Sequence, residues 1–386
     1  MSRRVFGPDP FFLGMVLVLA LGGVIVSGSA RAYEDAAIHA LPVGLVTSLV
    51  HLAVGFSLMV LVMVPDYRVV TRPAVAWALL GGSIVLLLVP FLFPPVANTW
   101  RWIRLGRLSI QPSELVKPVL AILLAAALAR AGGRIRTREG LARPLLLGGL
   151  LAAPVLLGRD LGTPVLYGIV TLVLVAVAGA RLRHLAVLVL AGAILFAGAA
   201  SLESYRLQRL MAFVHCLDGS ADTSPALRDA CYQLHQALVA LGSGGPLGKG
   251  LGHSTQKAFF LPEAGNDFVF AVLGEELGFV GAVAVVLLFL ALAWRTWRIA
   301  RAAVDPLGRY LALGAGWFLV IQALVHMGVA TGLLPTKGLP LPFFSAGGSS
   351  LVSSFVLAGI VLNVSLRTWG ASWTAAGDEP LPGGAP

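Results

Sequence analysis

Ten long apolar segments constrain the fold of this 386-residue chain more than any other feature of its sequence. A helix needs about 20 mostly apolar residues to cross a bilayer. The sequence therefore predicts an all-α, polytopic integral membrane protein of about ten transmembrane helices. The fifth and seventh segments are short, and we expect them to tilt or to be partly re-entrant. The segments lie near residues 11–28, 43–64, 74–93, 113–130, 144–158, 162–180, 185–200, 268–294, 310–333 and 349–366.

The composition agrees with this class and argues against others. Hydrophobic residues make up 58% of the chain and charged residues 12%, whereas soluble domains carry about 45–50% apolar and about 25% charged residues. A soluble enzyme, a disordered protein and a fibrous protein are therefore not expected. The net charge of +10 does not indicate nucleic-acid binding, because the basic residues lie in short loops between apolar segments, where they report topology.

The distribution of Lys and Arg predicts the orientation. With the N-terminus in the cytoplasm, the cytoplasmic side holds 16 of the 28 basic residues and six of the 18 acidic ones, and the other side holds 12 of each. Because Lys and Arg favour the cytoplasmic side, we expect both termini inside. One transmembrane domain should cover residues 1–370, with a large extracytoplasmic loop at about 201–267 and a disordered cytoplasmic tail over 371–386.

The first apolar segment has a second interpretation. Two arginines precede it and Ala30-Arg31-Ala32 follows it, which resembles a cleavable signal peptide. We expect an uncleaved first span. Cleavage would leave nine spans and an outside N-terminus, and the charges also allow that arrangement.

The two cysteines, Cys216 and Cys231, both lie in the large loop. On an oxidising face they can form a disulfide, and the alternative is a pair of free thiols. The disulfide is favoured because no metal-ligand spacing accompanies the cysteines.

Two charged residues open the fourth span, where ionisable side chains are costly and mark functional candidates. Glu114 and Lys117 are three residues apart, so they share a helix face and can pair. A structural ion pair and a substrate contact are about equally favoured by this spacing.

Aromatic and basic residues alternate just before this span. They fit an interfacial aromatic anchor with snorkelling arginines or a docking site for an anionic lipid headgroup. Three arginines on the outer side break the positive-inside pattern, which favours the docking site. The residues are Trp100, Arg101, Trp102, Arg104 and Arg107.

The end of the large loop combines glycines with charged residues. Gly248–Ser254 resembles a phosphate loop, but it lacks a preceding strand and a Gly-Lys-Ser/Thr motif, so a nucleotide site is rejected. Asp267 should lie at the outer mouth of the eighth span, as a helix cap or a functional acid. Glu275 and Glu276 should lie about two turns deeper, about 12–14 Å, and a structural pair is favoured over catalysis.

The segment between the last two spans is unusually rich in Pro and Gly. Residues 332–350 contain three prolines and a single cation, Lys337. Irregular backbone at membrane depth is tolerated where it is buried in protein or lines a cavity. We therefore interpret this segment as part of a binding cavity.

Taken together, these segments resemble the SEDS family of bacterial cell-wall polymerases over nearly the whole chain. The form Pro335-Thr336-Lys337-Gly338 is more similar to the division branch of the family than to the elongation branch. The motifs that carry the resemblance are Trp100–Ile103, Gln111–Glu114 with Lys117, Asp160–Thr163, Leu261–Glu263 with Asp267-Phe268, Gly274–Gly278, Leu334–Gly338, Leu341–Phe343 and Gly347–Ser350.

The resemblance implies a peptidoglycan glycosyltransferase that acts on lipid II outside the cytoplasmic membrane, together with a class B penicillin-binding transpeptidase and other division proteins. It maps the essential acid of the family onto Asp267. Two departures stand beside it: Gly265-Asn266 replaces a histidine and a small polar residue, and Ala346 replaces a tyrosine. These departures affect substrate positioning and rate rather than the reaction class.

The expected chemistry needs one base for the acceptor hydroxyl and cations for the departing polyprenyl diphosphate. Because diphosphate is a stable leaving group, no general acid is required, unlike in glycoside hydrolysis. Asp267 is the expected base. A divalent cation is left open as a cofactor, with no assigned site, and no nucleotide is expected. The substrate-binding candidates are Arg101, Glu114, Lys117, Asp160, Glu263, Lys337, Ser345 and Ser349.

Other functions use some of the same residues. A lipid flippase would share the headgroup site but would need a charge-lined path through the membrane and no base at the mouth. An ion-coupled transporter would show buried acids on several spans and inverted repeats, of which the sequence gives no convincing sign. A silent division scaffold is disfavoured by Asp267 and Lys337, and an elongation-type polymerase differs only in branch.

Overall fold

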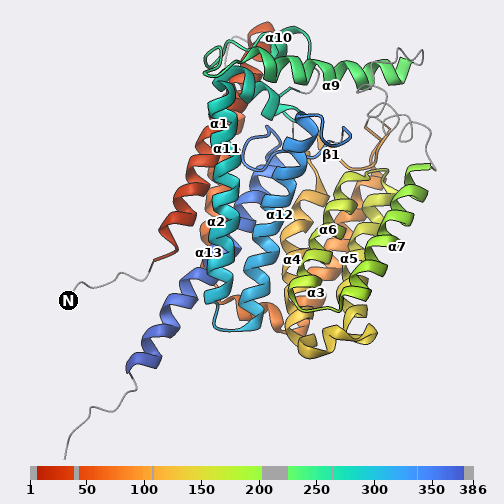
Figure 1. Ribbon diagram of the computed structural model, residues 1–386, viewed down its shortest axis with the longest axis vertical. Coiled ribbons are helices and arrows are strands. Elements are labelled where there is room, and N and C mark those ends of the chain that lie inside the picture. Colours follow the sequence, from red (N-terminus) through yellow and green to blue (C-terminus); the bar gives the residue numbers. More distant parts are fainter. Residues whose placement is uncertain are drawn as a thin grey trace, which may run out of the picture.

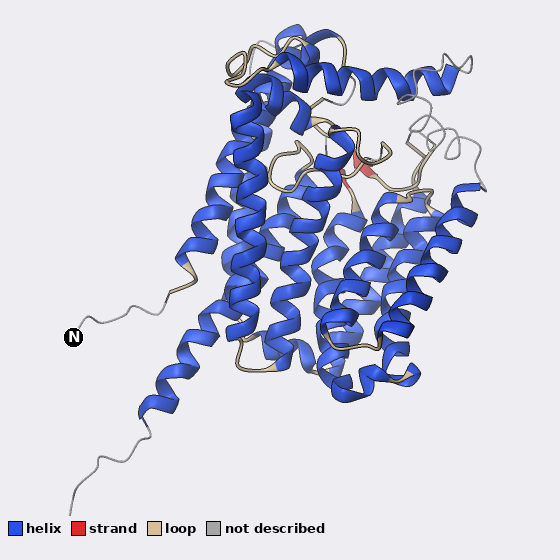
Figure 2. Cartoon of the chain, in the orientation of Figure 1, coloured by secondary structure: helices blue, strands red, loops and turns tan. Residues whose placement is uncertain are grey.

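The computed structural model of the chain describes residues 7–38, 43–96, 98–106, 108–201, 225–261, 264–336 and 338–377. Long helices packed side by side dominate these residues, and the only strands among them form one short hairpin (Figures 1 and 2). The long helices are α1 (Pro10–Ile38), α2 (Val43–Met63), α3 (Pro73–Leu88), α4 (Pro112–Ala131), α5 (Arg138–Leu157), α6 (Gly162–Val177), α7 (Leu182–Ser201), α11 (Val269–Ala302), α12 (Pro306–Ala330) and α13 (Gly348–Gly377).

Shorter elements connect the bundle. They are the 3-10 turns η1 (Tyr67–Thr71), η2 (Val89–Leu92) and η3 (Gly132–Arg136), the strands β1 (Ile103–Leu105) and β2 (Leu108–Ile110), and the helices α9 (Pro225–Ser243) and α10 (Gln256–Phe259). Helix α9 lies across one end of the bundle, near α10 (Figure 1). We call this end the loop face. The opposite end, which holds η1, η3 and the α11–α12 turn, is the arginine-rich face.

Each expected span corresponds to one long helix. In the described residues nine helices are long and apolar enough to cross a membrane, and α6 is a shorter apolar helix. The expectation of short fifth and seventh spans is wrong, because α5 and α7 have 20 residues each and α6 has 16. The fifth apolar segment underestimates the length of α5 because the first turns of this helix are polar. The helix is capped by the Thr137 hydroxyl, which accepts from the Gly140 N–H at 3.3 Å.

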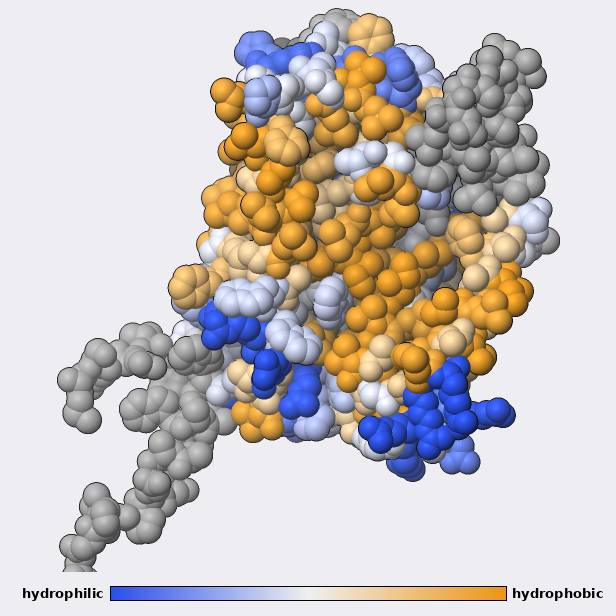
Figure 3. Space-filling view, viewed as in Figure 1, coloured by the Kyte–Doolittle hydropathy of each residue, from blue (hydrophilic) through white to orange (hydrophobic). Residues whose placement is uncertain are grey.

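The spans alternate in direction as the charge pattern requires. At the arginine-rich face, Asp9 before α1 is paired with Arg295 of α11 (2.5 Å), and Arg68 of η1 with Asp305 before α12 (2.8 Å). Burial raises the pKa of Tyr67, which donates to Asp305, to about 12. Figure 3 shows a broad hydrophobic band between hydrophilic residues at the two ends, as expected for a multi-pass membrane protein.

The centre of the bundle is formed by α4, α12 and α13. Helix α7 packs on the periphery against α6 and is almost wholly exposed. Helix α1 belongs to the core, where Phe12, Val16 and Leu19 are completely buried. This packing favours an uncleaved first span over a removable signal peptide.

Helix α11 is broken at Gly278, and the break corrects the expected depth of the acidic pair. Gly278 has φ 69° and ψ −170°, which ends the first helical piece at Leu277. Beyond it, Phe279 and Val280 donate their N–H groups to Gly245 and Pro246 of the loop face. The first piece therefore carries the acids toward the loop face instead of deeper into the bundle.

Glu275 and Glu276 both bond to side chains from other segments of the loop face. Glu275 accepts from Lys249 at 2.6 Å and from the Ser254 hydroxyl at 2.5 Å. Glu276 pairs with Lys257 and accepts from Ser29 of α1 at 2.7 Å. The pair is thus structural, as the sequence favoured.

The expected disulfide and the expected C-terminal tail both lie partly outside the described residues. Cys231 is disulfide-bonded, while Cys216 lies outside the described residues. The expected tail at 371–386 begins inside α13, which continues to Gly377, and residues 378–386 lie outside the description.

Candidate active site

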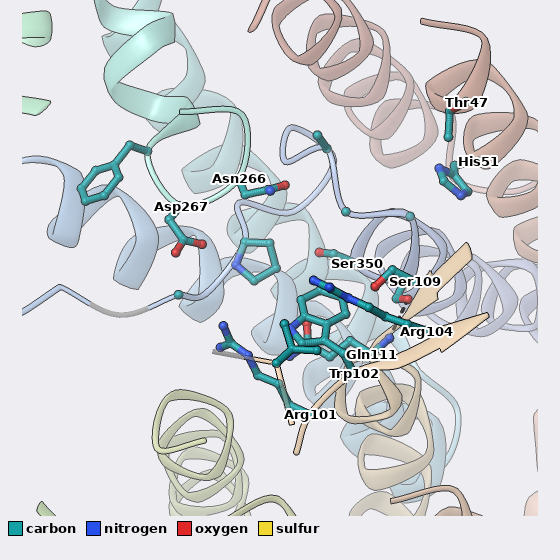
Figure 4. A pocket seen from close by; sticks show the side chains of 18 of the residues that line it. Thr47, His51, Arg101, Trp102, Arg104, Ser109, Gln111, Asn266, Asp267 and Ser350 are labelled. Atoms are coloured by element: carbon teal, nitrogen blue, oxygen red, sulfur yellow. Dashed lines mark hydrogen bonds between the residues drawn. The ribbon is translucent and has the colours of Figure 1, made fainter. Parts of the chain in front are cut away.

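A cavity of about 900 Å³ opens at the loop face between α2, the β-hairpin, the segment before α11 and the start of α13 (Figure 4). Its walls combine charged and apolar groups. Val46 and Val50 of α2, both more than half exposed, form an apolar wall. The cavity therefore suits a ligand with a polar head and an apolar tail. Its polar lining residues include Thr47, His51, Arg101, Trp102, Arg104, Ser109, Gln111, Asn266, Asp267, Ser349 and Ser350.

Asp267 and Arg101 approach each other at Gly338. An atom at the Cβ position of Gly338 would lie 3.1 Å from a carboxylate oxygen of Asp267 and 3.5 Å from Arg101 Nη1. In Figure 4 both side chains border the same opening. The N-cap of α11 is Phe268, without a side-chain cap hydrogen bond, so Asp267 is not the cap of α11. The arrangement places a carboxylate and a guanidinium where a ligand can meet both.

The segment that carries Asp267 is held by the Pro- and Gly-rich segment. Ser345 donates to the Asn266 carbonyl at 2.8 Å and accepts from the Leu341 N–H at 2.7 Å. The Ala346 N–H donates to the Gly265 carbonyl at 3.0 Å. Ser345 is therefore a positioning residue. Within the expected segment, 332–350, the residues that line the cavity are Gly338, Pro340 and 346–350.

The start of α13 is the second polar wall. Ser349 accepts from the Gln111 N–H at 3.0 Å, which joins the hairpin to α13. The His51 imidazole packs directly on Gly348, where a Cβ would overlap the ring. Ser350 Oγ is buried and has no hydrogen-bond partner among the described residues.

A buried ion pair lies behind the cavity wall and is connected to it through Gln322. Lys117 Nζ lies 2.6 Å from Glu114 Oε1 and 2.6 Å from Gln322 Oε1, and all three side chains are buried. Gln322 in turn donates to the Pro340 carbonyl at 2.7 Å. Burying two charges is costly unless they are paired and hydrogen-bonded. Here the pair links α4 and α12 to the cavity wall.

Two more buried groups hold the same region. His326, one helical turn after Gln322, lies 2.7 Å from the Leu339 carbonyl through Nδ1. Asp160 accepts from the Gly162 N–H at 2.9 Å and from the Thr163 hydroxyl at 2.8 Å at the start of α6. Asp160 therefore organises a turn instead of facing the cavity.

Of the expected site residues, the structure brings Asp267, Arg101 and Ser349 to the cavity, with Ser345 behind its wall. Glu114, Lys117 and Asp160 bond to protein groups, so a direct substrate role stays a prediction for them. Glu263, Lys337 and Arg107 lie outside the described residues. The described part of the chain contains no cluster of three or more His, Cys, Asp or Glu side chains suited to a metal ion.

Sequence reasoning missed His51, Gln322 and His326. For the last two a signal existed, since a Gln and a His four residues apart interrupt an apolar span and share one helix face. His51 gave no such signal, because only the fold brings α2 beside the start of α13.

Comparisons with known proteins identify the relatives of this chain. The sequence model of the cell cycle protein family FtsW/RodA/SpoVE matches residues 10–369. A probable peptidoglycan glycosyltransferase FtsW of Geobacter sp. (strain M18) is 38% identical over 96% of this chain and 100% of its own length. The corresponding protein of Nitrosococcus halophilus is 37% identical over 94% of this chain and 93% of its own.

Solved structures give the same fold. A chain of a peptidoglycan synthase complex that coordinates polymerization and crosslinking superposes with a TM-score of 0.77 and 30% identity, covering 94% of this chain and 98% of that chain. The rod shape determining protein RodA of Thermus thermophilus gives a TM-score of 0.66 at 30% identity, covering 93% of this chain and 96% of its own.

Proposed function

The chain belongs to the FtsW/RodA/SpoVE family of cell cycle proteins, and from that premise we propose that it polymerises lipid II into glycan strands with Asp267 as the general base. Its class is that of a membrane-embedded peptidoglycan glycosyltransferase. The observation that carries the proposal is the approach of Asp267 and Arg101 at Gly338 inside a cavity with an apolar wall.

The proposed step balances with these two groups. The acceptor sugar hydroxyl gives its proton to Asp267 while its oxygen bonds to the anomeric carbon of the donor. The bond from that carbon to the diphosphate oxygen breaks, and polyprenyl diphosphate leaves as an anion. Arg101 stabilises the charge that develops on the leaving group. No general acid is needed, because diphosphate is a stable anion.

The apolar wall suits the lipid part of the substrate. Val46 and Val50 lie on the exposed side of α2, so a polyprenyl chain can stay in the bilayer while the headgroup reaches Asp267. This arrangement favours a polymerase over a flippase, since the buried Glu114–Lys117 pair and its Gln322 contact fill the space below instead of lining an open polar path.

We assign the protein to the division branch, because the curated relatives at 37–38% identity are named FtsW. The proposal places the loop face outside the cytoplasmic membrane, both termini in the cytoplasm, and a penicillin-binding transpeptidase as partner. The similarity to a chain of a synthase complex supports such a partner.

The test is glycan-strand formation from purified lipid II by the protein co-purified with its transpeptidase. Asp267→Asn should lower polymer formation at least a hundredfold, in line with general-base removal, while folding and partner binding are retained. Asp66→Asn is the matched control, since it removes an exposed carboxylate at the arginine-rich face and should leave polymer formation unchanged. Equal polymer from Asp267→Asn and wild type would refute the base assignment, and lipid transport without polymer would favour the flippase.

A further inference from the structure

The end of α11 at the arginine-rich face carries a surface that the proposed reaction does not use. Leu287, Leu290, Trp294 and Trp297 recur every three or four residues and are between 44% and 58% exposed. This spacing places them in one stripe along the helix. The stripe ends in tryptophans, which favour the membrane–water interface.

Two arginines extend the stripe beyond the tryptophans. The Arg298 guanidinium stacks on the Trp294 ring at 5.1 Å, and the Arg301 guanidinium stacks on the Trp297 ring at 5.9 Å. Among the described residues neither arginine has a carboxylate within salt-bridge distance. Their positive charges are therefore held in place by the rings and stay available to an anion.

A hollow of about 310 Å³ lies beside this stripe. It is lined by Asp9, Arg295, Arg298, Ile299, Ala302, Ser365 and Thr368. The Asp9 carboxylate is already paired with Arg295 at 2.5 Å. Within the part of the chain that the structure describes, Arg298 is thus the cation at the hollow that has no carboxylate partner. The hydroxyl of Thr368 adds a polar group to the same wall.

We infer that this surface binds the headgroup of an anionic phospholipid, with its phosphate at Arg298 in the hollow and its acyl chains along the stripe. The continuity of stripe, tryptophans and arginines favours a lipid over free phosphate, because only a lipid contacts the apolar and charged parts together. It also favours a lipid over an acidic protein, because the exposed leucines belong to a helix apolar enough to span a membrane.

The test is native mass spectrometry of the purified full-length protein in detergent, titrated with phosphatidylglycerol and, separately, with phosphatidylcholine. Arg298→Ala/Arg301→Ala should weaken phosphatidylglycerol binding about tenfold, since each juxtamembrane arginine contributes a few-fold to anionic-lipid affinity. Binding of phosphatidylcholine should not change. The matched control is Arg134→Ala/Arg136→Ala, which removes two exposed arginines of η3 at the same face.

The control should keep phosphatidylglycerol affinity within twofold of wild type. Trp294→Leu/Trp297→Leu keeps all charges and should weaken binding less than the arginine variant does. Equal losses of phosphatidylglycerol affinity in both arginine variants would show that only the net positive charge of the face matters, and would overturn the site. Unchanged binding in Arg298→Ala/Arg301→Ala would overturn it as well. Full competition by inorganic phosphate at millimolar concentration would also overturn the lipid assignment. Thermal unfolding of each variant checks that the protein is folded, so that the lipid affinities of folded proteins are compared.

Discussion

Gly338 is the residue that separates the two charged groups of the cavity. A side chain there would reach into the space between Asp267 and Arg101, with its Cβ 3.1 Å and 3.5 Å from their polar atoms. We expect Gly338→Ala to slow glycan polymerisation several-fold and Gly338→Val to slow it further, because in the proposed reaction the added atoms would take space that the reacting sugar needs. Polymer assays of both variants check this order.

Stability should change little in the Gly338 variants, since the added atoms face the cavity. Thermal unfolding in detergent is the accompanying measurement. A Val variant with the wild-type rate would show that the substrate does not pass between the two charged groups.

The Glu114–Lys117 pair is predicted to behave as a buried structural unit. Lys117→Met leaves the Glu114 carboxylate buried without its cation, and breaking such a pair costs about 3–5 kcal/mol. The double variant Glu114→Gln/Lys117→Met removes both charges and should be more stable than Lys117→Met alone. Unfolding free energies of the two single variants and the double variant form the required cycle. Strictly additive losses would contradict the coupling of the pair.

At this scale the sequence located the charged residues but not their roles. The spacing of Glu114 and Lys117 predicted a shared helix face and left two roles equally favoured. The fold adds what spacing could not supply, because it brings Gln322 to Lys117 and the Pro340 carbonyl to Gln322. Spacing along one helix carries no information about what the neighbouring helices supply.

Gly278 is the residue at which helix α11 is broken. Its backbone lies in a region that is essentially restricted to glycine, and a Cβ would overlap the backbone of Leu247 and Gly248. We expect Gly278→Ala to destabilise the protein by about 3 kcal/mol or more. Polymerisation should fall too, because the helical piece that ends at this turn, residues 269–277, directly follows the segment that carries Asp267. Thermal unfolding and polymer assays measure the two effects.

Gly192→Ala in α7 is the control for this substitution. Nothing lies within 4 Å of a Cβ at Gly192, and alanine is a better helix former than glycine. The control should therefore be neutral or slightly stabilising. Similar destabilisation of both variants would mean that the strain at Gly278 is not the cause.

The elements themselves were largely predictable, whereas their ends and breaks were not. Hydrophobic length is a property of the sequence alone, so each of the ten predicted segments matches a helix in the described residues, nine of them long enough to cross a membrane. The polar start of α5, the break at Gly278 and the extension of α13 to Gly377 depend on caps and contacts that an apolar run does not record. The same is true of α9, which lies across the bundle end.

At the scale of the whole molecule, the charge pattern predicted which loops share a face. The ion pairs Asp9–Arg295 and Arg68–Asp305 join those loops in the structure. The positive-inside rule, and not the fold, predicts which face is cytoplasmic. The proposed reaction needs the loop face outside, since that face holds Asp267.

Cysteine labelling in intact cells tests this orientation. Leu247 is 79% exposed at the loop face, and Arg136 is exposed at the opposite face. A membrane-impermeant maleimide should label Leu247→Cys in intact spheroplasts and Arg136→Cys only after permeabilisation. The disulfide-bonded Cys231 does not react with maleimide, so the background stays low. The reverse labelling pattern would place Asp267 in the cytoplasm, away from the compartment where glycan strands are built, and would rule out the proposed reaction.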